Sequence, residues 1–387
     1  MRANKCLVYV PVPHLGWGWV QVCVSILEGF PSDTIGPVLY IPRTFRAIAR
    51  TVSVREAVPH IVPFRYAACF SRSILNYRFR RALATAEPDS TIVYFWPSPP
   101  LSMVRYARKR GFITVREMIN TCINSAQVIL DDAYDRLGLT AVRPPRVSKE
   151  AADREQEELG LHNYIMSPNR RIDDSLVSIG IHQTKILRST YGWSPSRIDS
   201  KRNLSKDRFR LLFVGGDTIR KGLPQLLAAW KRSNVSGELV VVGKVEPILH
   251  PIVAPYLERN DIRIVEFVQD LGPLYKSSDA FVLPSLEEGD PLVTYEAAAS
   301  GLPIIATPMG SASILKHGHN GFVVQPYDID ELAEAIARLA NSPEMRKQMG
   351  YQAAKDAQEF RLDKIGESRA KILNQLLADA LKAAKRH

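Results

Sequence analysis

Two successive series of short apolar runs constrain the fold of this 387-residue chain most strongly. In the first half, strand-like runs lie at residues 5–12, 90–98 and 112–119, and a strand followed by a helix is predicted over 164–181. The pattern restarts in the second half with runs at residues 210–216, 237–243, 262–268, 280–285, 302–308 and 321–325. Helical or turn-like segments separate the runs, which predicts βαβ units and a parallel sheet in each half.

The chain length and one polar stretch predict two domains. A serine-rich segment without hydrophobic periodicity separates the two series, and we place an interdomain linker there at residues 196–208. The expected boundaries are residues 1–195 for the N-terminal domain, 209–363 for the C-terminal domain and 364–387 for a final helix with a basic end. The predicted architecture is α/β, with two parallel-sheet domains facing each other across a cleft.

The cysteines and the N-terminus exclude several protein classes. The four cysteines are widely spaced, with no C-x-x-C pair and no neighbouring histidine cluster, which argues against a zinc site or a disulfide framework. The first apolar run is short and interrupted by prolines, so it predicts neither a signal peptide nor a membrane span. We therefore expect a cytoplasmic protein without a bound metal.

The net charge of +11 is concentrated in the first third of the chain. Residues 1–116 hold 16 Lys and Arg against 5 Asp and Glu, with clusters at 76–82 and 105–111. These clusters are either the solvated outer faces of helices or a surface for an anionic partner. Of the possible partners, the clusters favour an anionic membrane surface over nucleic acid, because no nucleic-acid motif accompanies them.

Two carboxylates, Glu288 and Glu296, lie eight positions apart behind the apolar run at 280–285. Glu288 is predicted in the loop at the carboxyl end of that strand, and Glu296 inside a short helix that Gly301 ends. Ligands bind at this edge of open parallel sheets. The pair can accept hydrogen bonds from two sets of sugar hydroxyls, although the alternative of two solvated charges stays open.

A glycine turn opens the second half. The strand at 210–216 ends in Gly215 and Gly216, and Arg220 and Lys221 precede Gly222 and a predicted helix. Glycines allow a ligand to approach the backbone, and the helix start and two cations favour an anion. The stretch lacks the spacing of a P-loop, and surface charge is the alternative.

Together these motifs resemble the family 4 glycosyltransferases, the retaining, metal-independent group with the GT-B fold. The resemblance rests on "PSLEEGDPLVTYEA", which carries the E-x7-E pair, on "VGGDTIRKG" and on "HGHNGFVV". It is strongest over residues 210–360 and recognisable over 157–198. It implies two Rossmann-like domains, with the C-terminal helix crossing back to the first domain.

The resemblance also implies roles for individual residues. Arg220 and Lys221 would hold the diphosphate of a nucleotide sugar, Glu288 the transferred sugar, and Glu296 the ribose, with Glu287 as a bystander. The remaining donor-binding residues would be Gly215, Gly216, Val268, Gly289, Asp290, Pro291, Leu292 and Val293. The sequence departs from the family at Asp290 and Pro291, in place of Phe-Gly, and no histidine follows the middle strand of the first domain.

The predicted function is transfer of a sugar from a nucleoside-diphosphate sugar to an acceptor hydroxyl, with retention of configuration and without a cofactor or metal. The acceptor would be a glycan, a lipid-linked sugar or a polysaccharide precursor. His14, Gly16 and Trp17 are the candidate acceptor wall, although Trp17 has turn packing as an alternative role. Two rival hypotheses remain, a nucleotide-sugar epimerase and a non-catalytic protein that binds anions or membranes.

Overall fold

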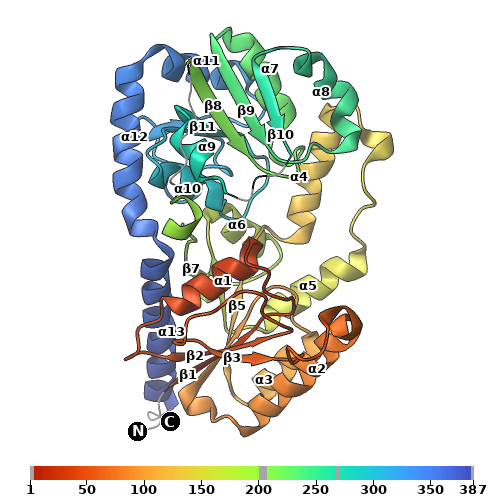
Figure 1. Cartoon of the computed structure of the whole chain (residues 1–387). Coiled ribbons are helices and arrows are strands. Elements are labelled where there is room, and N and C mark those ends of the chain that lie inside the picture. Colours follow the sequence, from red (N-terminus) through yellow and green to blue (C-terminus); the bar gives the residue numbers. More distant parts are fainter. Residues whose placement is uncertain (1–3, 200–206, 267, 269, 385–387) are drawn as a thin grey trace. The chain divides into compact units, whose positions relative to one another are not determined.

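The structure is a computed structural model that describes residues 4–199, 207–266, 268 and 270–384 (Figure 1). These residues form two compact units. The first unit comprises Met1–Ile119, Lys149–Ser189 and Leu362–His387, and the second comprises Asn120–Ser148 and Thr190–Arg361. The chain therefore passes between the units more than once.

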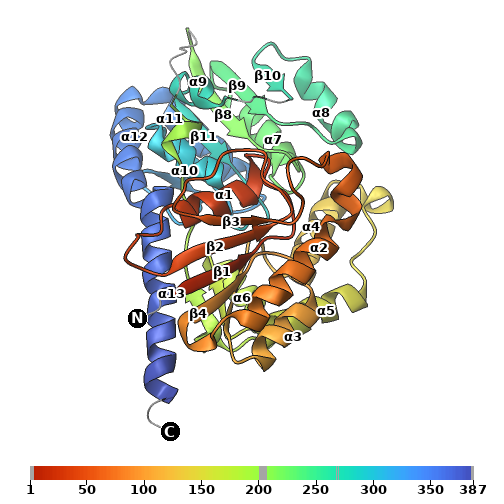
Figure 2. The ribbon, with the colours of Figure 1, turned by 60° about the horizontal axis from the view of Figure 1, so that its bottom comes forward.

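The first unit contains a parallel sheet of seven described strands in the order β3-β2-β1-β4-β5-β6-β7. Because successive side chains of a strand point to opposite faces, Tyr9 and Phe95 pack on Phe79 of α2 (Phe64–Thr85), while Tyr94 contacts Arg369 of α13 (Leu362–Ala384). Figure 2 shows the sheet between these two helices. The strands are β1 (Lys5–Tyr9), β2 (Gly36–Ile41), β3 (Ser53–Glu56), β4 (Thr91–Phe95), β5 (Ile113–Glu117), β6 (Tyr164–Ser167) and β7 (Ile186–Arg188). The helices are α1 (Gly18–Glu28), α2 (Phe64–Thr85), α3 (Leu101–Lys109), α5 (Lys149–Leu161), α6 (Arg170–Ser178) and α13 (Leu362–Ala384).

The second unit contains a parallel sheet of six described strands in the order β10-β9-β8-β11-β12-β13. The strands are β8 (Phe209–Val214), β9 (Gly237–Val242), β10 (Ile262–Val265), β11 (Ala280–Leu283), β12 (Ile304–Ala306) and β13 (Gly321–Val323). The helices are α4 (Ile123–Arg136), α7 (Leu223–Ser233), α8 (His250–Leu257), α9 (Gly272–Lys276), α10 (Leu292–Ala299), α11 (Ile329–Asn341) and α12 (Pro343–Ala357).

Both sheets follow the Rossmann order, in which the first three strands run to one side of the sheet and the later described strands, four in the first sheet and three in the second, run to the other. The order reverses between β1 and β4 in the first sheet and between β8 and β11 in the second. Ligands of doubly wound folds bind outside the carboxyl ends of the strands at this switch point. In the second unit, the predicted glycine turn and the predicted acid pair follow these two strands.

The C-terminal helix α13 packs on α1 within the first unit. The helices cross so closely that a Cβ atom at Gly366 would lie 2.3 Å from the carbonyl oxygen of Ile26. Asn4 donates to the Asn374 side chain at 3.0 Å, which fixes the helix near the start of β1. The structure therefore confirms the prediction that the C-terminal helix crosses back to the first domain.

The structure confirms two parallel-sheet, Rossmann-like domains. The sequence analysis did not predict β2, β3, β7, α4 or α5, and it indicated α2 only through the possible helix face at residues 76–82. The unit boundaries also differ from the expected ones, because Asn120–Ser148, with α4, belongs to the second unit. Most of the expected linker, residues 200–206, lies outside the described residues.

Candidate functional site

Two loops meet at the switch point of the second sheet. One follows β8 and carries Arg220 and Lys221, and the other follows β11 and carries Glu287 and Glu288. The Leu286 amide donates to the Arg220 carbonyl at 2.8 Å. Gly222 has φ +74°, and a Cβ atom there would lie 2.2 Å from the Pro284 carbonyl oxygen. Only glycine permits this conformation and this approach, so Gly222 brings the cations and the acids together.

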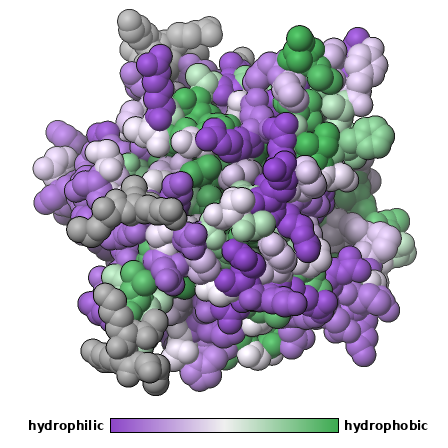
Figure 3. Space-filling model, turned by 90° about the horizontal axis from the view of Figure 1, so that it is seen from below, coloured by the Kyte–Doolittle hydropathy of each residue, from purple (hydrophilic) through white to green (hydrophobic). Residues whose placement is uncertain are grey.

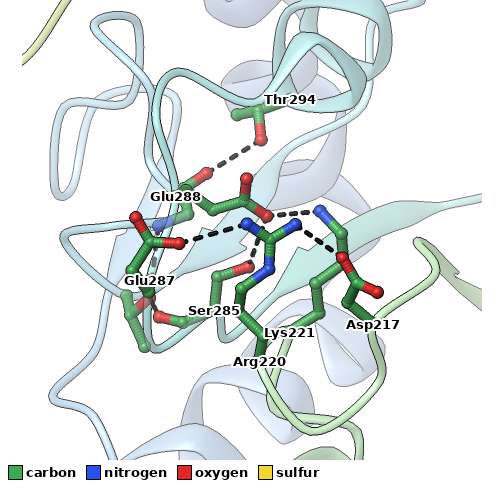
Figure 4. Close-up of polar contacts among 9 residues, drawn as sticks. Asp217, Arg220, Lys221, Ser285, Glu287, Glu288 and Thr294 are labelled. Atoms are coloured by element: carbon green, nitrogen blue, oxygen red, sulfur yellow. Dashed lines mark hydrogen bonds and ion pairs between the residues drawn. The ribbon is translucent and has the colours of Figure 1, made fainter. Parts of the chain in front are cut away.

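Lys221 and Glu288 form an ion pair through Nζ and Oε1, and the Ser285 hydroxyl donates to the same oxygen at 3.2 Å (Figure 4). The aliphatic part of Lys221 lies across Gly215, where a Cβ atom would be 2.1 Å from the lysine Cδ. At Gly216, by contrast, no described heavy atom lies within 4 Å of a Cβ position. The absence of a side chain at Gly215 therefore makes room for Lys221, and its absence at Gly216 leaves the backbone accessible to a ligand.

Arg220 lies between two acids, with Nη1 3.1 Å from Glu287 and Nη2 2.8 Å from Asp217 (Figure 4). Burial alone would lower the pKa of Arg220, but the charges of Glu288, Glu287 and Asp217 outweigh it and raise that pKa. The guanidinium is therefore a permanent cation at the strand ends. Its Nε is buried and has no hydrogen-bond partner among the described residues.

Glu287 is not the bystander that we expected. Its carboxylate is buried, binds Arg220, and accepts hydrogen bonds from Thr121 at 3.2 Å to the amide and 2.8 Å to the hydroxyl. Thr121 lies just before α4, so Glu287 joins this helix to the loop after β11. The sequence offered no local signal for this contact, since 166 positions separate the two residues.

Glu296 lies inside α10 and is fully buried. Its carboxylate pairs with Arg197 and accepts a hydrogen bond from the Tyr275 hydroxyl at 3.0 Å. Burial raises the pKa of Glu296, and Arg197 and Tyr275 offset only part of that rise. The helical position is as predicted, but both carboxylate oxygens are bound by protein groups, so a ribose would have to compete with Arg197 and Tyr275.

The predicted loop residues after Glu288 divide into a buried and a half-buried group. Gly289, Asp290 and Pro291 are buried, whereas Leu292, Val293 and the more distant Val268 are half-buried. The Asp290 carboxylate accepts hydrogen bonds from the Tyr191 amide at 2.7 Å and from the Tyr295 hydroxyl at 2.9 and 3.0 Å. Asp290 therefore anchors the loop to its own unit.

The candidate acceptor residues follow β1 in the first unit. His14 is buried, and its Nε2 lies 2.8 Å from the Gln21 side-chain oxygen. Gly16 has φ +87° and is packed against Arg46. The Trp17 side chain is 66% exposed, so it does not pack into the turn, whereas Trp19 stacks on Trp96 with ring centroids 5.9 Å apart.

The chemistry of the second-unit site is that of anion and hydroxyl binding. Two cations, two buried acids and an accessible glycine backbone can hold a phosphate group beside hydroxyl groups. Among the described residues, no three His, Cys, Asp or Glu side chains gather in a way that could hold a metal ion.

Comparisons with known proteins agree with this geometry. Residues 196–356 match the family model of glycosyl transferases group 1. An uncharacterized glycosyltransferase of Haemophilus influenzae is 29% identical over 46% of this chain and 53% of its own length. The capsular polysaccharide biosynthesis glycosyltransferase CapM of Staphylococcus aureus is 28% identical over 39% of this chain and 42% of its own length. The chain thus spans about half the length of these curated relatives.

Solved structures match almost the whole chain in fold. Sucrose-phosphate synthase from Thermosynechococcus elongatus aligns with a TM-score of 0.71 at 17% identity, covering 97% of this chain and 100% of that one. Anabaena HepE in complex with UDP and glucose aligns with a TM-score of 0.66 at 15% identity, covering 98% and 100%. The chain therefore has the GT-B fold, and its residues 196–356 are similar to the glycosyl transferases group 1.

Proposed function

We propose that this protein transfers a sugar from a nucleoside-diphosphate sugar to the hydroxyl of a glycan, a lipid-linked sugar or a polysaccharide precursor. The observation that carries the proposal is the Lys221–Glu288 pair beside the Arg220–Glu287 pair, at the switch point of the matched sheet. The complex of HepE with UDP and glucose supports a nucleotide sugar as the donor. CapM supports polysaccharide biosynthesis as the process.

Departure of the diphosphate leaves an oxocarbenium-like carbon and a growing negative charge on the leaving group. Lys221 and Arg220 are placed to stabilise that charge, which is the main electrostatic demand of the step. A charge-assisted hydrogen bond contributes about 1.5–3 kcal/mol, and about 1.4 kcal/mol is a tenfold change in rate. Loss of the Lys221 ammonium should therefore slow diphosphate release roughly 10- to 100-fold.

Glu288 would hold hydroxyls of the transferred sugar, and Glu296 the ribose once Arg197 has moved away. We further propose retention of the anomeric configuration, as in the family 4 enzymes, and a reaction that needs no metal because the two cations supply the positive charge. Product NMR tests the first point, since retention requires the anomeric centre of the product to match that of the donor. An unchanged rate in excess chelator is the expected result for the second.

The direct test is nucleoside-diphosphate release from a panel of UDP-, GDP- and ADP-sugars. We expect release with one donor, reduced in both Lys221→Ala and Glu288→Ala. Lys231→Ala is the matched control, because Lys231 is an exposed lysine in the last turn of α7. Equal release by wild type and Lys221→Ala would contradict the assigned role of Lys221.

The same panel decides between this function and its rivals. An epimerase would release a free sugar without an acceptor, and a non-catalytic protein would bind vesicles or polyanions without turnover. Neither rival gains support from the family match.

We also propose that the first unit binds an anionic membrane surface through α2. This helix contains five arginines and no acidic residue. Tyr66, Phe70, Ile74 and Tyr77 recur every three or four positions and are exposed, on the side away from the buried Leu75 and Phe79. On the face of the molecule that Figure 3 shows, hydrophobic side chains form separate patches among hydrophilic ones. Aromatic and basic side chains on one helix face suit the interface of a bilayer with anionic lipids.

None of the described helices is apolar over a length that could cross a bilayer. The test of surface binding is sedimentation with phosphatidylcholine vesicles, with and without phosphatidylglycerol. We expect binding only to the anionic vesicles, weakened by salt and by Phe70→Ser. Tyr351→Ser, at an exposed aromatic residue of the second unit, is the control. Equal binding to both vesicle types would contradict the electrostatic part of the proposal.

A further inference from the structure

A cavity of about 380 Å³ lies inside the second unit, beside the Arg220–Glu287 pair. One wall is α4 with the preceding Asn120, and the opposite wall is formed by Asp217–Arg220, Glu246 and Glu287. Of the residues proposed to hold the donor, Arg220 lines the cavity, whereas Lys221, Glu288 and Glu296 do not. The volume is within the range of roughly 300–1,000 Å³ that is usual for small-molecule sites.

Several polar groups of this cavity have unused hydrogen-bonding capacity. Tyr134 is only 8% exposed, and its hydroxyl forms no hydrogen bond within the described part of the chain. The same is true of the Asn120 amide, of Oε1 of Glu246 and of the buried Nε of Arg220. Buried polar groups in proteins are normally satisfied, because an unsatisfied one is costly. Of the four groups, only the Arg220 Nε is a buried atom without a partner among the described residues, and Asn120 and Glu246 are half-buried. One unsatisfied buried donor with three further free polar groups around the same cavity therefore points to a polar ligand.

The kind of ligand follows from the lining. Asp131, Asp217, Glu246 and Glu287 supply four carboxylates against the two guanidinium groups of Arg143 and Arg220. This excess of acids disfavours a second phosphate or an acidic sugar. Carboxylate, amide and phenol groups suit hydroxyls, and Leu130, Ala126 and Pro144 offer an apolar surface for a ring. An uncharged, hydroxyl-rich ring fits both features.

The cavity and the proposed donor site share a wall. Arg220 and Glu287 face the cavity, while the next residues in the two loops, Lys221 and Glu288, form the ion pair of the donor site. A sugar held in the cavity would thus lie next to the place where the donor sugar is released. Burial, together with the charges of Glu246 and Asp217, raises the pKa of Tyr134, so its hydroxyl stays protonated and can donate to a ligand.

We propose that this cavity binds an uncharged sugar of the acceptor, with Tyr134 and Asn120 among the groups that bind its hydroxyls. The inference rests on the proposed transferase function and gives α4 a role in binding that neither the family motifs nor the charge pattern indicated. It also places acceptor binding in the second unit, in addition to the candidate residues after β1.

The test is saturation-transfer NMR with methyl glycosides of glucose, galactose, mannose and N-acetylglucosamine. We expect at least one glycoside to bind, and Tyr134→Phe and Asn120→Ala each to weaken it roughly two- to tenfold, the effect of one lost neutral hydrogen bond. Neither variant removes a described hydrogen bond, so we expect both variants to fold and weaker binding to report on the cavity itself. Tyr351→Phe, at an exposed tyrosine, is the control.

Parallel titrations with UDP, GDP and ADP separate the possible outcomes. Weaker nucleotide binding in Tyr134→Phe, with glycoside binding unchanged, would assign the cavity to the donor and overturn the inference. The absence of binding by every glycoside would overturn it too. Glycoside binding without turnover of any nucleotide sugar would instead overturn the proposed function and the acceptor role, while the sugar site itself would stand.

Discussion

The two units share one strand order but use their buried charges differently. In the first unit, Arg369 of α13 binds Glu117 of β5, and Tyr94 of β4 donates to the same carboxylate; all three side chains are fully buried. In the second unit, Arg220 and Lys221 pair with acids in loops, and Arg220 remains 20% exposed beside a cavity. A buried ion pair whose two side chains come from the sheet and from a helix stabilises the fold. Charges at the carboxyl ends of strands, next to a cavity, form a candidate binding site.

The sharpest test of this contrast is Arg369→Met. Removing one partner of a buried ion pair leaves the other charge without compensation, which costs about 3–5 kcal/mol. We expect that loss in the free energy of unfolding, measured with urea. Lys371→Met, on the exposed side of the same helix, is the control. A loss of less than about 1 kcal/mol for Arg369→Met would show that the pair is not part of the framework.

A second test concerns the backbone of the site. Gly222→Ala places a side chain at φ +74° and a Cβ atom 2.2 Å from the Pro284 carbonyl oxygen. The left-handed conformation alone costs about 1–2 kcal/mol, and the steric overlap adds to it. We expect about 2 kcal/mol or more of lost stability by urea unfolding. Gly216→Ala, in the same loop but in open space, should change little. Similar values for both variants would contradict the assigned role of Gly222.

The difference between the units also explains what could be predicted from the sequence. Every strand of the second sheet is a distinct apolar run, and the glycine turn and the acid pair are local motifs, so their positions after β8 and β11 were predicted. In the first unit, β3 is half exposed and β7 has three residues, so neither gives a strong apolar signal.

Residues that act through distant contacts were missed. Glu287 binds Thr121, and Tyr134 lines the same cavity as the loop after β8, because α4 and the residues before it belong to the second unit. The sequence analysis assigned no element to residues 123–136, which form α4. The partners of the Asp290 carboxylate, Tyr295 and the Tyr191 amide, were not predicted either, while its place against the donor stays a prediction. A single sequence contains no direct information on contacts between residues that lie far apart in the chain.

A third test uses pH. His162 and Glu158 of the first unit are buried, with His162 Nε2 2.7 Å from Glu158. Burial lowers the pKa of His162, and Arg116 and His162 together overcome burial to lower the pKa of Glu158. Both groups therefore bind protons more readily in the unfolded chain, so stability must fall as pH falls below about 6.5 for His162 and about 4.5 for Glu158.

The variant that isolates the histidine is His162→Gln. It should flatten the loss of stability below pH 6.5, where one proton accounts for at most about 1.4 kcal/mol per pH unit. Urea unfolding of both proteins at a series of pH values gives the comparison. The same slope in both proteins would mean that other groups cause the acid sensitivity.

The smallest loss of stability is expected for an exposed ion pair of the first unit, which lies outside both the buried core and the candidate site. Arg105 of α3 pairs with Glu157 of α5, and their side chains are 57% and 46% exposed. Water and salt screen such a pair, so Arg105→Ala should cost less than about 1 kcal/mol, and less still in high salt. Arg105 also lies in a basic cluster, so its loss should weaken vesicle binding only if α3 touches the membrane together with α2. A large loss of stability from Arg105→Ala would mean that the exposure of an ion pair does not predict its contribution to the free energy of unfolding. In that case only the position of an ion pair in the fold would distinguish the charges that stabilise the first unit from those of the candidate site.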